Sequence, residues 1–261
     1  MNAPDLAGRA IVVTRPAEQA RALVDRLQAI GAEPVAFPAI EIGPPAHPAA
    51  MTAVLRSLAR PESFDLAIFV SPTAVACCFA ALRVAGLAWP TALRTAAIGE
   101  GSAQALYERG ITAVLVPQAS FDSEGLLATP ALAQPAGRRI AIVRGDGGRD
   151  LLGDTLRARG AVVEYVTCYA RSRPATDPAP LVTRWAGGHI DAVNFTSSEG
   201  LGFFVDIIGA AGRDCLVRTP TFVSHPRIAD TAKSHGIHQI VTTGPGDDRL
   251  IAALGDFFAI K

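Results

Sequence analysis

Lysine is almost missing from this chain, and no excess of either charge sign compensates for it. Of 24 basic residues only Lys233 and Lys261 are lysines, which leaves 22 arginines, and 24 acidic residues bring the formal net charge to zero. A balanced charge argues against a general nucleic-acid surface or an anionic membrane surface, because both need a basic excess. The arginine bias reflects either composition or arginines that hold carboxylates or phosphates with two hydrogen bonds.

The chain also lacks a long uninterrupted apolar run, and we expect no secretion signal in its first residues. Its most apolar segment, LAIFVSPTAVACCFAAL at 66–82, is broken by Ser71-Pro72 and followed by Arg83, which predicts a strand and then a helix. The first ten residues, MNAPDLAGRA, have no charged-then-apolar pattern. Four cysteines without CxxC or zinc spacing predict reduced thiols: Cys77, Cys78, Cys168 and Cys215. We therefore expect a cytoplasmic protein without a membrane segment.

Motifs for metals, cofactors and nucleophilic catalysis are absent too. The sequence contains no GxGxxG, GxxxxGK[ST] or GxSxG, and its five histidines have no metal-ligand spacing. We expect neither a metal nor an organic cofactor. The loop VRGDGGR at 143–149 leaves two interpretations open: a nucleotide-binding loop, or a tight turn after a strand.

What the chain does have is an internal repeat. Residues 8–32 align without a gap on 137–161, with 10 of 25 positions identical at a constant offset of 129. Agreement continues at offsets of 124 to 126, where DLAIFVS (65–71) aligns with DAVNFTS (191–197). The pattern indicates a tandem duplication of about 125 residues.

Short apolar runs alternate with helical stretches along both copies. Ten runs are expected to be strands: 10–13, 33–37, 66–70, 95–99, 113–117, 139–143, 162–166, 191–195, 221–224 and 239–242. They are almost continuously hydrophobic, as strands covered on both faces must be. Strand–helix alternation predicts an α/β fold with parallel sheets, and ten strands suit two five-stranded domains with helices on both faces.

The domain boundary is expected inside each copy and not between the copies. Equivalent positions at 38–41 and 167–170 precede proline-rich stretches, GPPAHP at 43–48 and RSRPATDPAP at 171–180. If both are crossovers, one domain comprises 1–37 plus 174–261 and the other comprises 41–167. The linkers are then 38–40 and 168–173, and the copies exchange their first strands.

Polar residues follow the predicted strands in both copies. Ligands of open α/β sheets bind beyond the carboxyl ends of the strands, and free amide groups at helix starts suit anions. Simple helix capping explains each residue taken alone, whereas the whole set suits a ligand with several anionic groups. The candidate binding residues are Thr14, Arg15, Ser71, Ser102, Arg144, Gly145, Ser197, Ser198, Ser224 and Arg227. Tyr169 lies at a crossover, where the other copy has Ile40, and it either packs as a hinge residue or supplies a phenol for hydrogen bonding or proton transfer.

Taken in order, these motifs resemble the uroporphyrinogen-III synthase family along essentially the whole chain. The resemblance rests on TRP after the first strand, FVSPTAV, IGEGSAQAL, VRGDGGR, the tyrosine of VTCYAR, and FTSSEGL. It implies two flavodoxin-like domains joined by a two-stranded linker, and no metal or organic cofactor. The chain departs from the family at FVSHPRIAD (222–230), where other members have a glycine-threonine version, and Ser102 replaces a threonine found in some members.

The resemblance also implies a substrate and a reaction. The substrate would be hydroxymethylbilane, a linear tetrapyrrole with an acetate and a propionate on every ring, cyclised with inversion of ring D and loss of water. Tyr169 matches the family's linker tyrosine, and we expect it to act as the general acid. We further expect a monomer, with a transient handover of substrate from hydroxymethylbilane synthase.

Two other functions fit the same residues. The first is a non-catalytic binder or sensor of a polyanionic small molecule, because a fold does not dictate a function. The second is a nucleotide-dependent α/β enzyme that uses the loop at 144–149. Consumption of hydroxymethylbilane distinguishes the synthase from the first, and stabilisation by nucleotides would favour the second.

Overall fold

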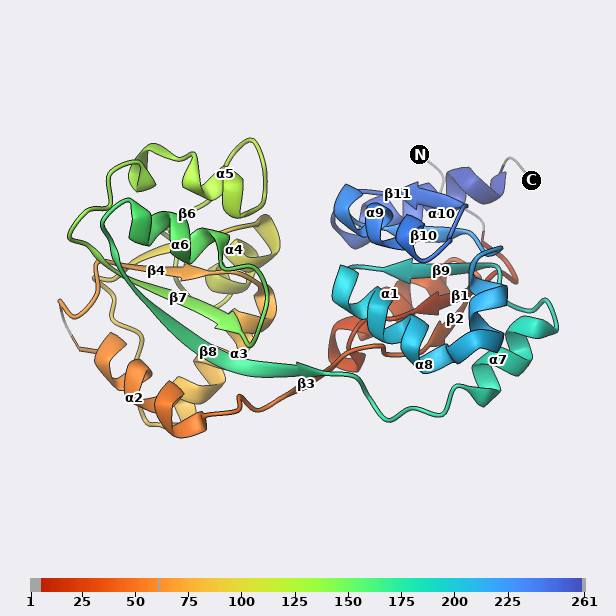
Figure 1. Ribbon diagram of the computed structural model, residues 1–261, viewed down its shortest axis with the longest axis horizontal. Helices are drawn as coiled ribbons and strands as arrows, with labels where there is room; N and C mark the ends of the chain where they lie inside the picture. Colours follow the sequence, from red (N-terminus) through yellow and green to blue (C-terminus); the bar gives the residue numbers. More distant parts are fainter. Residues whose placement is uncertain (1–5, 61, 260–261) are drawn as a thin grey trace. The chain divides into compact units, whose positions relative to one another are not determined.

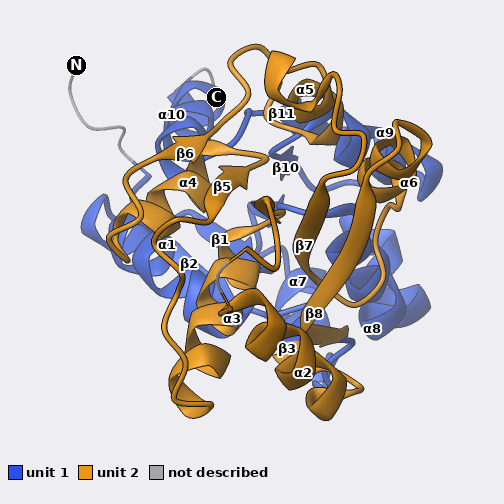
Figure 2. Ribbon diagram, turned by 90° about the vertical axis from the view of Figure 1, so that its left-hand side faces the viewer, with its two compact units in different colours: residues 1–41, 172–261 blue, residues 42–171 orange. Residues whose placement is uncertain are grey.

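The computed structural model describes residues 6–60 and 62–259 (Figure 1). The start of MNAPDLAGRA and the outermost ends of the predicted domain 1–37 plus 174–261 lie outside these residues. The chain divides into two compact units: unit 1 comprises 1–41 and 172–261, and unit 2 comprises 42–171 (Figure 2). Each unit is an α/β domain.

Unit 1 contains a five-stranded, wholly parallel sheet. Its strands are β1 (Ala10–Val13), β2 (Glu33–Ala36), β9 (Ala192–Phe195), β10 (Thr221–Val223) and β11 (Ile240–Thr242). Their spatial order is β11-β10-β9-β1-β2. Numbered along the unit, this is 2-1-3-4-5, the flavodoxin-like order, in which the direction of winding reverses between strands 1 and 3. In unit 1 the reversal lies between β1 and β9.

Unit 2 contains six strands, where the sequence predicts five. They are β3 (Glu41–Gly43), β4 (Leu66–Phe69), β5 (Arg94–Ala97), β6 (Val114–Leu115), β7 (Arg139–Gly145) and β8 (Val162–Ser172), in the order β3-β8-β7-β4-β5-β6. The extra strand is β3, which directly follows the predicted linker 38–40 and borders β8. Strand β8 is long enough to support it because it continues to Ser172, well past the predicted end at residue 166.

The two sheets repeat one another. If unit 2 is numbered from β7, then β7, β8, β4, β5 and β6 follow the same 2-1-3-4-5 order as β1, β2, β9, β10 and β11. These are the equivalences that the sequence repeat predicts, since 8–32 aligns with 137–161. Each unit therefore combines the first two strands of one copy with the last three strands of the other.

Helices cover both faces of each sheet. Their bounds are α1 (Ala17–Ala29), α2 (Pro48–Leu58), α3 (Pro72–Val84), α4 (Glu100–Tyr107), α5 (Ser123–Leu127), α6 (Leu151–Ala158), α7 (Ala179–Ala186), α8 (Ser198–Leu216), α9 (Pro226–Ser234) and α10 (Asp247–Ala259), with a short 3-10 helix at Pro130–Leu132. In unit 1, α7, α8 and α9 share one apolar core, and α1 and α10 share another. In unit 2, α2, α3 and α4 are opposed by α5 and α6.

The alternation of side chains along a strand explains why the strands read as continuous apolar runs. In β1, Ala10 and Val12 pack with α7 and α8, whereas Ile11 and Val13 pack with α1 and α10. All four are buried, so no position of the strand is left for a polar residue. Of the helices in the described part of the chain, none combines the length and apolar composition needed to traverse a bilayer.

Candidate active site

In each unit, the candidate residues gather at the carboxyl edge of the sheet. In unit 1 they follow β1, β9 and β10, and in unit 2 they follow β4 and β5 or lie on β7 and β8. The reversal of winding, where open sheets bind ligands, lies between β1 and β9 in unit 1 and between β7 and β4 in unit 2. The sequence-predicted set therefore separates into two clusters, one for each unit.

Tyr169 is the central residue of the unit 2 cluster. Its side chain is only 4% exposed and packs in the core beneath α3. Its hydroxyl lies 3.1 Å from the Oγ of Ser71, the residue that caps the N-terminus of α3. The Ser71 Oγ also accepts a hydrogen bond from the backbone N–H of Ala74 at 3.0 Å. A buried phenol is thus held at a helix N-terminus, where negative charge is stabilised.

A bulge in β8 aims Tyr169 at that position. Strand pairing runs regularly to Arg144 and Thr167, and then Gly145 pairs with Tyr169, so Cys168 is the extra residue. The tyrosine ring lies directly against Gly145: a Cβ atom there would come within 2.5 Å of the ring carbons. Only glycine accommodates the ring in this place.

Arg144 is occupied by its own loop. Its side chain is largely buried, and its guanidinium pairs with Asp150 at 2.7 Å and donates to the carbonyl oxygens of Gly145 and Gly147. It also lies 4.8 Å from the centre of the Tyr165 ring. A role for Arg144 in carboxylate binding stays a prediction, and its present contacts organise the loop instead. The positive φ angles of Gly147 and Gly148 make that loop a tight turn.

Arg171 is a member of this cluster that the sequence reasoning missed. Its backbone N–H donates to the carboxylate of Asp146 at 2.9 Å, and its Nη2 donates to the Asp146 carbonyl oxygen at 2.8 Å. Its guanidinium carbon lies 5.9 Å from the centre of the Tyr169 ring. The spacing of Tyr169 and Arg171 on one face of an extended segment is the signal that could have identified it.

Unit 2 also contains the candidate Ser102 and two cysteines of α3, Cys77 and Cys78. Ser102 is buried in the first turn of α4, so it faces the protein interior. A hydrogen bond to Cys168, together with burial, raises the pKa of the Cys78 thiol well above its usual value. Burial also raises the pKa of the Cys77 thiol. Both thiols are therefore protonated near neutral pH, which disfavours a cysteine nucleophile at this site.

In unit 1, Thr14 connects the two strands at the reversal of winding. Its buried hydroxyl donates to the carbonyl oxygen of Asn194 on β9 at 2.7 Å. Asn194 donates in turn to the Phe222 carbonyl at 3.2 Å, and its Oδ1 is buried without a hydrogen-bond partner among the described residues. Asn194 was not predicted, because an asparagine inside an apolar strand gives no pattern of its own.

Arg15, the residue equivalent to Arg144, is likewise committed to an ion pair. Its Nη1 lies 2.5 Å from the carboxylate of Asp247, the first residue of α10, and both side chains are mostly buried. The equivalent arginines near the carboxyl end of the first strand of each copy therefore pair with an aspartate at a helix start, Asp247 for Arg15 and Asp150 for Arg144. Partly buried pairs of this kind fix the loop geometry.

The hydroxyls of unit 1 act mainly at helix starts. Ser197 caps α8 and accepts from the Gly200 N–H at 3.0 Å, while Ser198 contacts Thr231 of α9 at 3.0 Å. The cap of α9 is His225, whose Nδ1 accepts from the backbone N–H of Arg227 at 3.1 Å. Ser224 precedes this cap, and the Arg227 side chain is exposed on the first turn.

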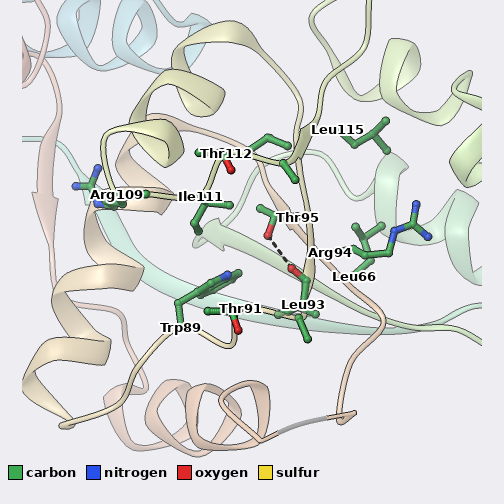
Figure 3. Close-up of a pocket in the computed structure, with 14 residues that line it drawn as sticks. Leu66, Trp89, Thr91, Leu93, Arg94, Thr95, Arg109, Ile111, Thr112 and Leu115 are labelled. Atoms are coloured by element: carbon green, nitrogen blue, oxygen red, sulfur yellow. Dashed lines mark hydrogen bonds between the residues drawn. The ribbon is translucent and has the colours of Figure 1, made fainter.

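Unit 2 also has a cavity of about 640 Å³, and none of the candidate site residues lines it (Figure 3). Its walls include Trp89, Arg94, Arg109 and Thr112, together with Leu66 at the beginning of β4. These positions belong to the amino edge of the sheet, opposite the edge that carries Ser71 and Tyr169. Among the described residues, no group of three histidine, cysteine or acidic side chains is arranged to hold a metal ion.

Comparison with known proteins agrees with this architecture. Residues 21–252 match the family model for uroporphyrinogen-III synthase HemD. The uroporphyrinogen-III synthases of Salmonella typhimurium and Escherichia coli are each 35% identical over 246 residues, which cover 94% of this chain and 99% of either relative.

Solved structures support the fold. A crystal structure of a mutant uroporphyrinogen III synthase from Thermus thermophilus matches with a TM-score of 0.67 and 22% identity, over 96% of this chain and 98% of that one. The uroporphyrinogen-III synthetase of Helicobacter pylori matches with a TM-score of 0.59 and 14% identity, over 97% and 100%. By the family model and the two full-length relatives, this chain belongs to the uroporphyrinogen-III synthase family.

Proposed function

We propose that this chain is a cyclising hydro-lyase that converts hydroxymethylbilane to uroporphyrinogen III in haem biosynthesis, with inversion of ring D and loss of water. The observation that carries the proposal is the 35% identity to uroporphyrinogen-III synthases over 94% of this chain and 99% of theirs. The substrate is a small molecule, which agrees with the neutral overall charge and with candidate residues placed at sheet edges.

Tyr169 serves as the general acid in this proposal. Its hydroxyl proton passes to the hydroxyl group of the ring A hydroxymethyl substituent, the C–O bond breaks, and water leaves. The pyrrole nitrogen of ring A donates electrons as this bond breaks, so that ring A becomes an azafulvenium cation. The tyrosine becomes a phenolate. The substituted α-carbon of ring D then forms a bond to the ring A methylene carbon, which gives the spiro intermediate. The bond from that α-carbon to its methylene bridge with ring C breaks, and the other α-carbon of ring D bonds to the bridge. That carbon loses its proton, which returns to the phenolate. The net change is the loss of one water.

The tetrapyrrole itself supplies the reactive electrons, so the protein needs an acid and a firm hold on the substrate. Backbone N–H groups at helix starts can bind the substrate carboxylates: Ser197 caps α8, His225 caps α9 and Ser71 caps α3. Of the candidate arginines Arg15, Arg144 and Arg227, Arg227 is the one with an exposed side chain, so we assign it a carboxylate contact. Such contacts would select the conformation in which ring D inverts.

The cellular setting remains part of the proposal. We place the enzyme in the cytoplasm as a monomer. It receives its substrate from hydroxymethylbilane synthase, because spontaneous closure of the free substrate would otherwise compete with the enzyme. None of these three points is needed for the chemistry above.

The test supplies hydroxymethylbilane to the purified protein and measures consumption and the ratio of type III to type I uroporphyrinogen. The proposal predicts mainly the type III isomer. Formation of type I alone, at the rate seen without protein, would leave a non-catalytic binder as the better description.

Replacing Tyr169 by phenylalanine tests the acid. General acid catalysis contributes about 10²- to 10⁴-fold, and kcat should fall by an amount in that range. Tyr165→Phe is the matched control, because Tyr165 lies on the same strand and its buried hydroxyl has no hydrogen-bond partner among the described residues. Tyr165→Phe should retain the wild-type kcat. A Tyr169→Phe enzyme with wild-type kcat would exclude the acid role.

A further inference from the structure

We propose that Ser71 is a positioning residue for Tyr169: its hydroxyl donates a hydrogen bond to the tyrosine oxygen and stabilises the phenolate that proton transfer leaves behind. This inference rests on the proposed function, since it gives Tyr169 the role of acid. It also gives Ser71 a task different from the direct carboxylate binding that the sequence suggests.

In the neutral pair either hydroxyl can donate, but once Tyr169 has lost its proton only Ser71 can, and its proton is available for that bond. The Ser71 Oγ already accepts from the Ala74 backbone N–H at 3.0 Å, so its own proton is free to point elsewhere. The tyrosine oxygen at 3.1 Å is the polar atom beside it. With Ser71 donating, the tyrosine proton is not used within the pair and remains available for the substrate.

The pair becomes stronger when the tyrosine loses its proton. A hydrogen bond to an ionised oxygen is shorter and about twice as strong as a bond between neutral groups. The chain from the Ala74 N–H through Ser71 to Tyr169 also connects the phenolate to the N-terminus of α3, a 13-residue helix whose dipole favours negative charge. The charge therefore develops where the surroundings are already arranged to receive it.

The duplication shows that capping alone does not require this arrangement. Ser197 is equivalent to Ser71 and caps α8 by the same bond, from Gly200 at 3.0 Å. The residue equivalent to Tyr169 is Ile40, which packs against the first turn of α8, since a Cβ on Gly200 would lie 3.2 Å from its Cδ1. The serine performs one task in unit 1 and two in unit 2.

A double-mutant cycle in the full-length enzyme tests the proposal, with hydroxymethylbilane as substrate. Ser71→Ala should lower kcat about 10- to 100-fold with little change in KM, the loss expected when a hydrogen bond to a charged group is removed. Ser71→Thr keeps both the cap and the hydroxyl and should restore most of kcat. Because Ser71 acts through Tyr169, Ser71→Ala combined with Tyr169→Phe should be no slower than Tyr169→Phe alone.

The outcomes separate this inference from the function on which it rests. If Ser71→Ala keeps the wild-type kcat while Tyr169→Phe loses it, the inference is wrong and the acid role stands. Losses that multiply in the double variant would equally overturn it, since they would mean that Ser71 acts independently of the phenol. If wild-type protein does not consume hydroxymethylbilane, the proposed function itself fails.

Discussion

Units 1 and 2 share the order of five strands, yet they differ at a pair of equivalent positions near the carboxyl edge of the sheet. Unit 1 has Ser197 and Ile40, whereas unit 2 has Ser71 and Tyr169. Both serines accept a hydrogen bond from a backbone N–H in the first turn of the helix, so the helix start is capped in both units. The comparison indicates that duplication supplied two similar scaffolds, and in our proposal the side chain of Tyr169 gives unit 2 its chemistry.

A second pair of equivalent residues, Arg15 and Arg144, makes the same kind of contact in both units. Arg15 and Arg144 each lie near the carboxyl end of the first strand of their copy, and each pairs with an aspartate at a helix start. The opening phrases of the repeat are thus alike because they build the same kind of loop. For Arg15 and Arg144, the shared ion pair explains why the two copies keep an arginine at this position.

The largest effect on the difference between the two units is expected from a substitution that displaces the Tyr169 ring. In Gly145→Ala, the new Cβ would lie 2.5 Å from the ring carbons, so the ring must leave the position in which it bonds Ser71. We expect kcat to fall about 10- to 100-fold, as for loss of the hydrogen bond itself. Steady-state assays with hydroxymethylbilane measure this.

Gly202→Ala is the matched control, because a Cβ there meets no atom within 4 Å. It should leave kcat unchanged and, being in helix α8, should raise stability slightly. Equal kcat in Gly145→Ala and wild type would mean that the position of the ring does not matter.

A smaller effect, on the local stability of two helix starts, distinguishes the capping role of Ser71 from its contact with Tyr169. Ser197→Ala and Ser71→Ala each remove one N-cap, which costs about 1 kcal/mol. Ser71→Ala also removes the hydrogen-bond partner of the Tyr169 hydroxyl, so the first turn of α3 should lose more protection than that of α8. Hydrogen exchange of the Ala74 and Gly200 amides measures each helix start by itself. Equal losses would indicate that the bond between Ser71 and Tyr169 adds nothing to stability.

The smallest expected effect is on stability and concerns an ion pair outside the candidate site, Arg149 with Glu124. The guanidinium of Arg149 contacts both oxygens of Glu124 at 2.5 and 3.1 Å and lowers the pKa of that carboxyl below its ordinary value. A lowered pKa stabilises the fold above the unfolded value, and this contribution is lost as pH falls through the folded value. Because both groups are about half exposed, the loss should be small.

Urea unfolding measures this pH dependence in wild type and in Glu124→Gln. The variant should show a slightly weaker loss of stability between neutral and acidic pH. A stronger loss in the variant would contradict the direction of the shift.

Much of the fold follows from the sequence because buried parallel strands leave a continuous apolar pattern. All ten predicted strands are present, and the exchange of strands between copies follows from the repeat. Strand β3 was missed because three residues beside a proline-rich segment carry no pattern, and its pairing depends on the long β8. Strand order along the edge of a sheet is a tertiary property that local patterns do not contain.

The candidate site was less predictable. Ser71 and Tyr169 belong to the same set of family motifs, but their contact depends on the bulge at Cys168 and on the space at Gly145. Arg144 was predicted as a carboxylate ligand, and only the folded structure reveals that Asp150 and two carbonyl oxygens occupy it. Residue type indicates what a side chain can do, whereas its partners decide what it is free to do.

The most direct test is a single-turnover experiment with enzyme in excess over hydroxymethylbilane, comparing wild type with Tyr169→Phe. Wild type should convert the substrate rapidly to uroporphyrinogen III. The variant should consume it far more slowly yet still favour type III, because the groups that hold the carboxylates are intact. Consumption by the variant at the wild-type rate would contradict the assignment of the acid to the tyrosine of unit 2.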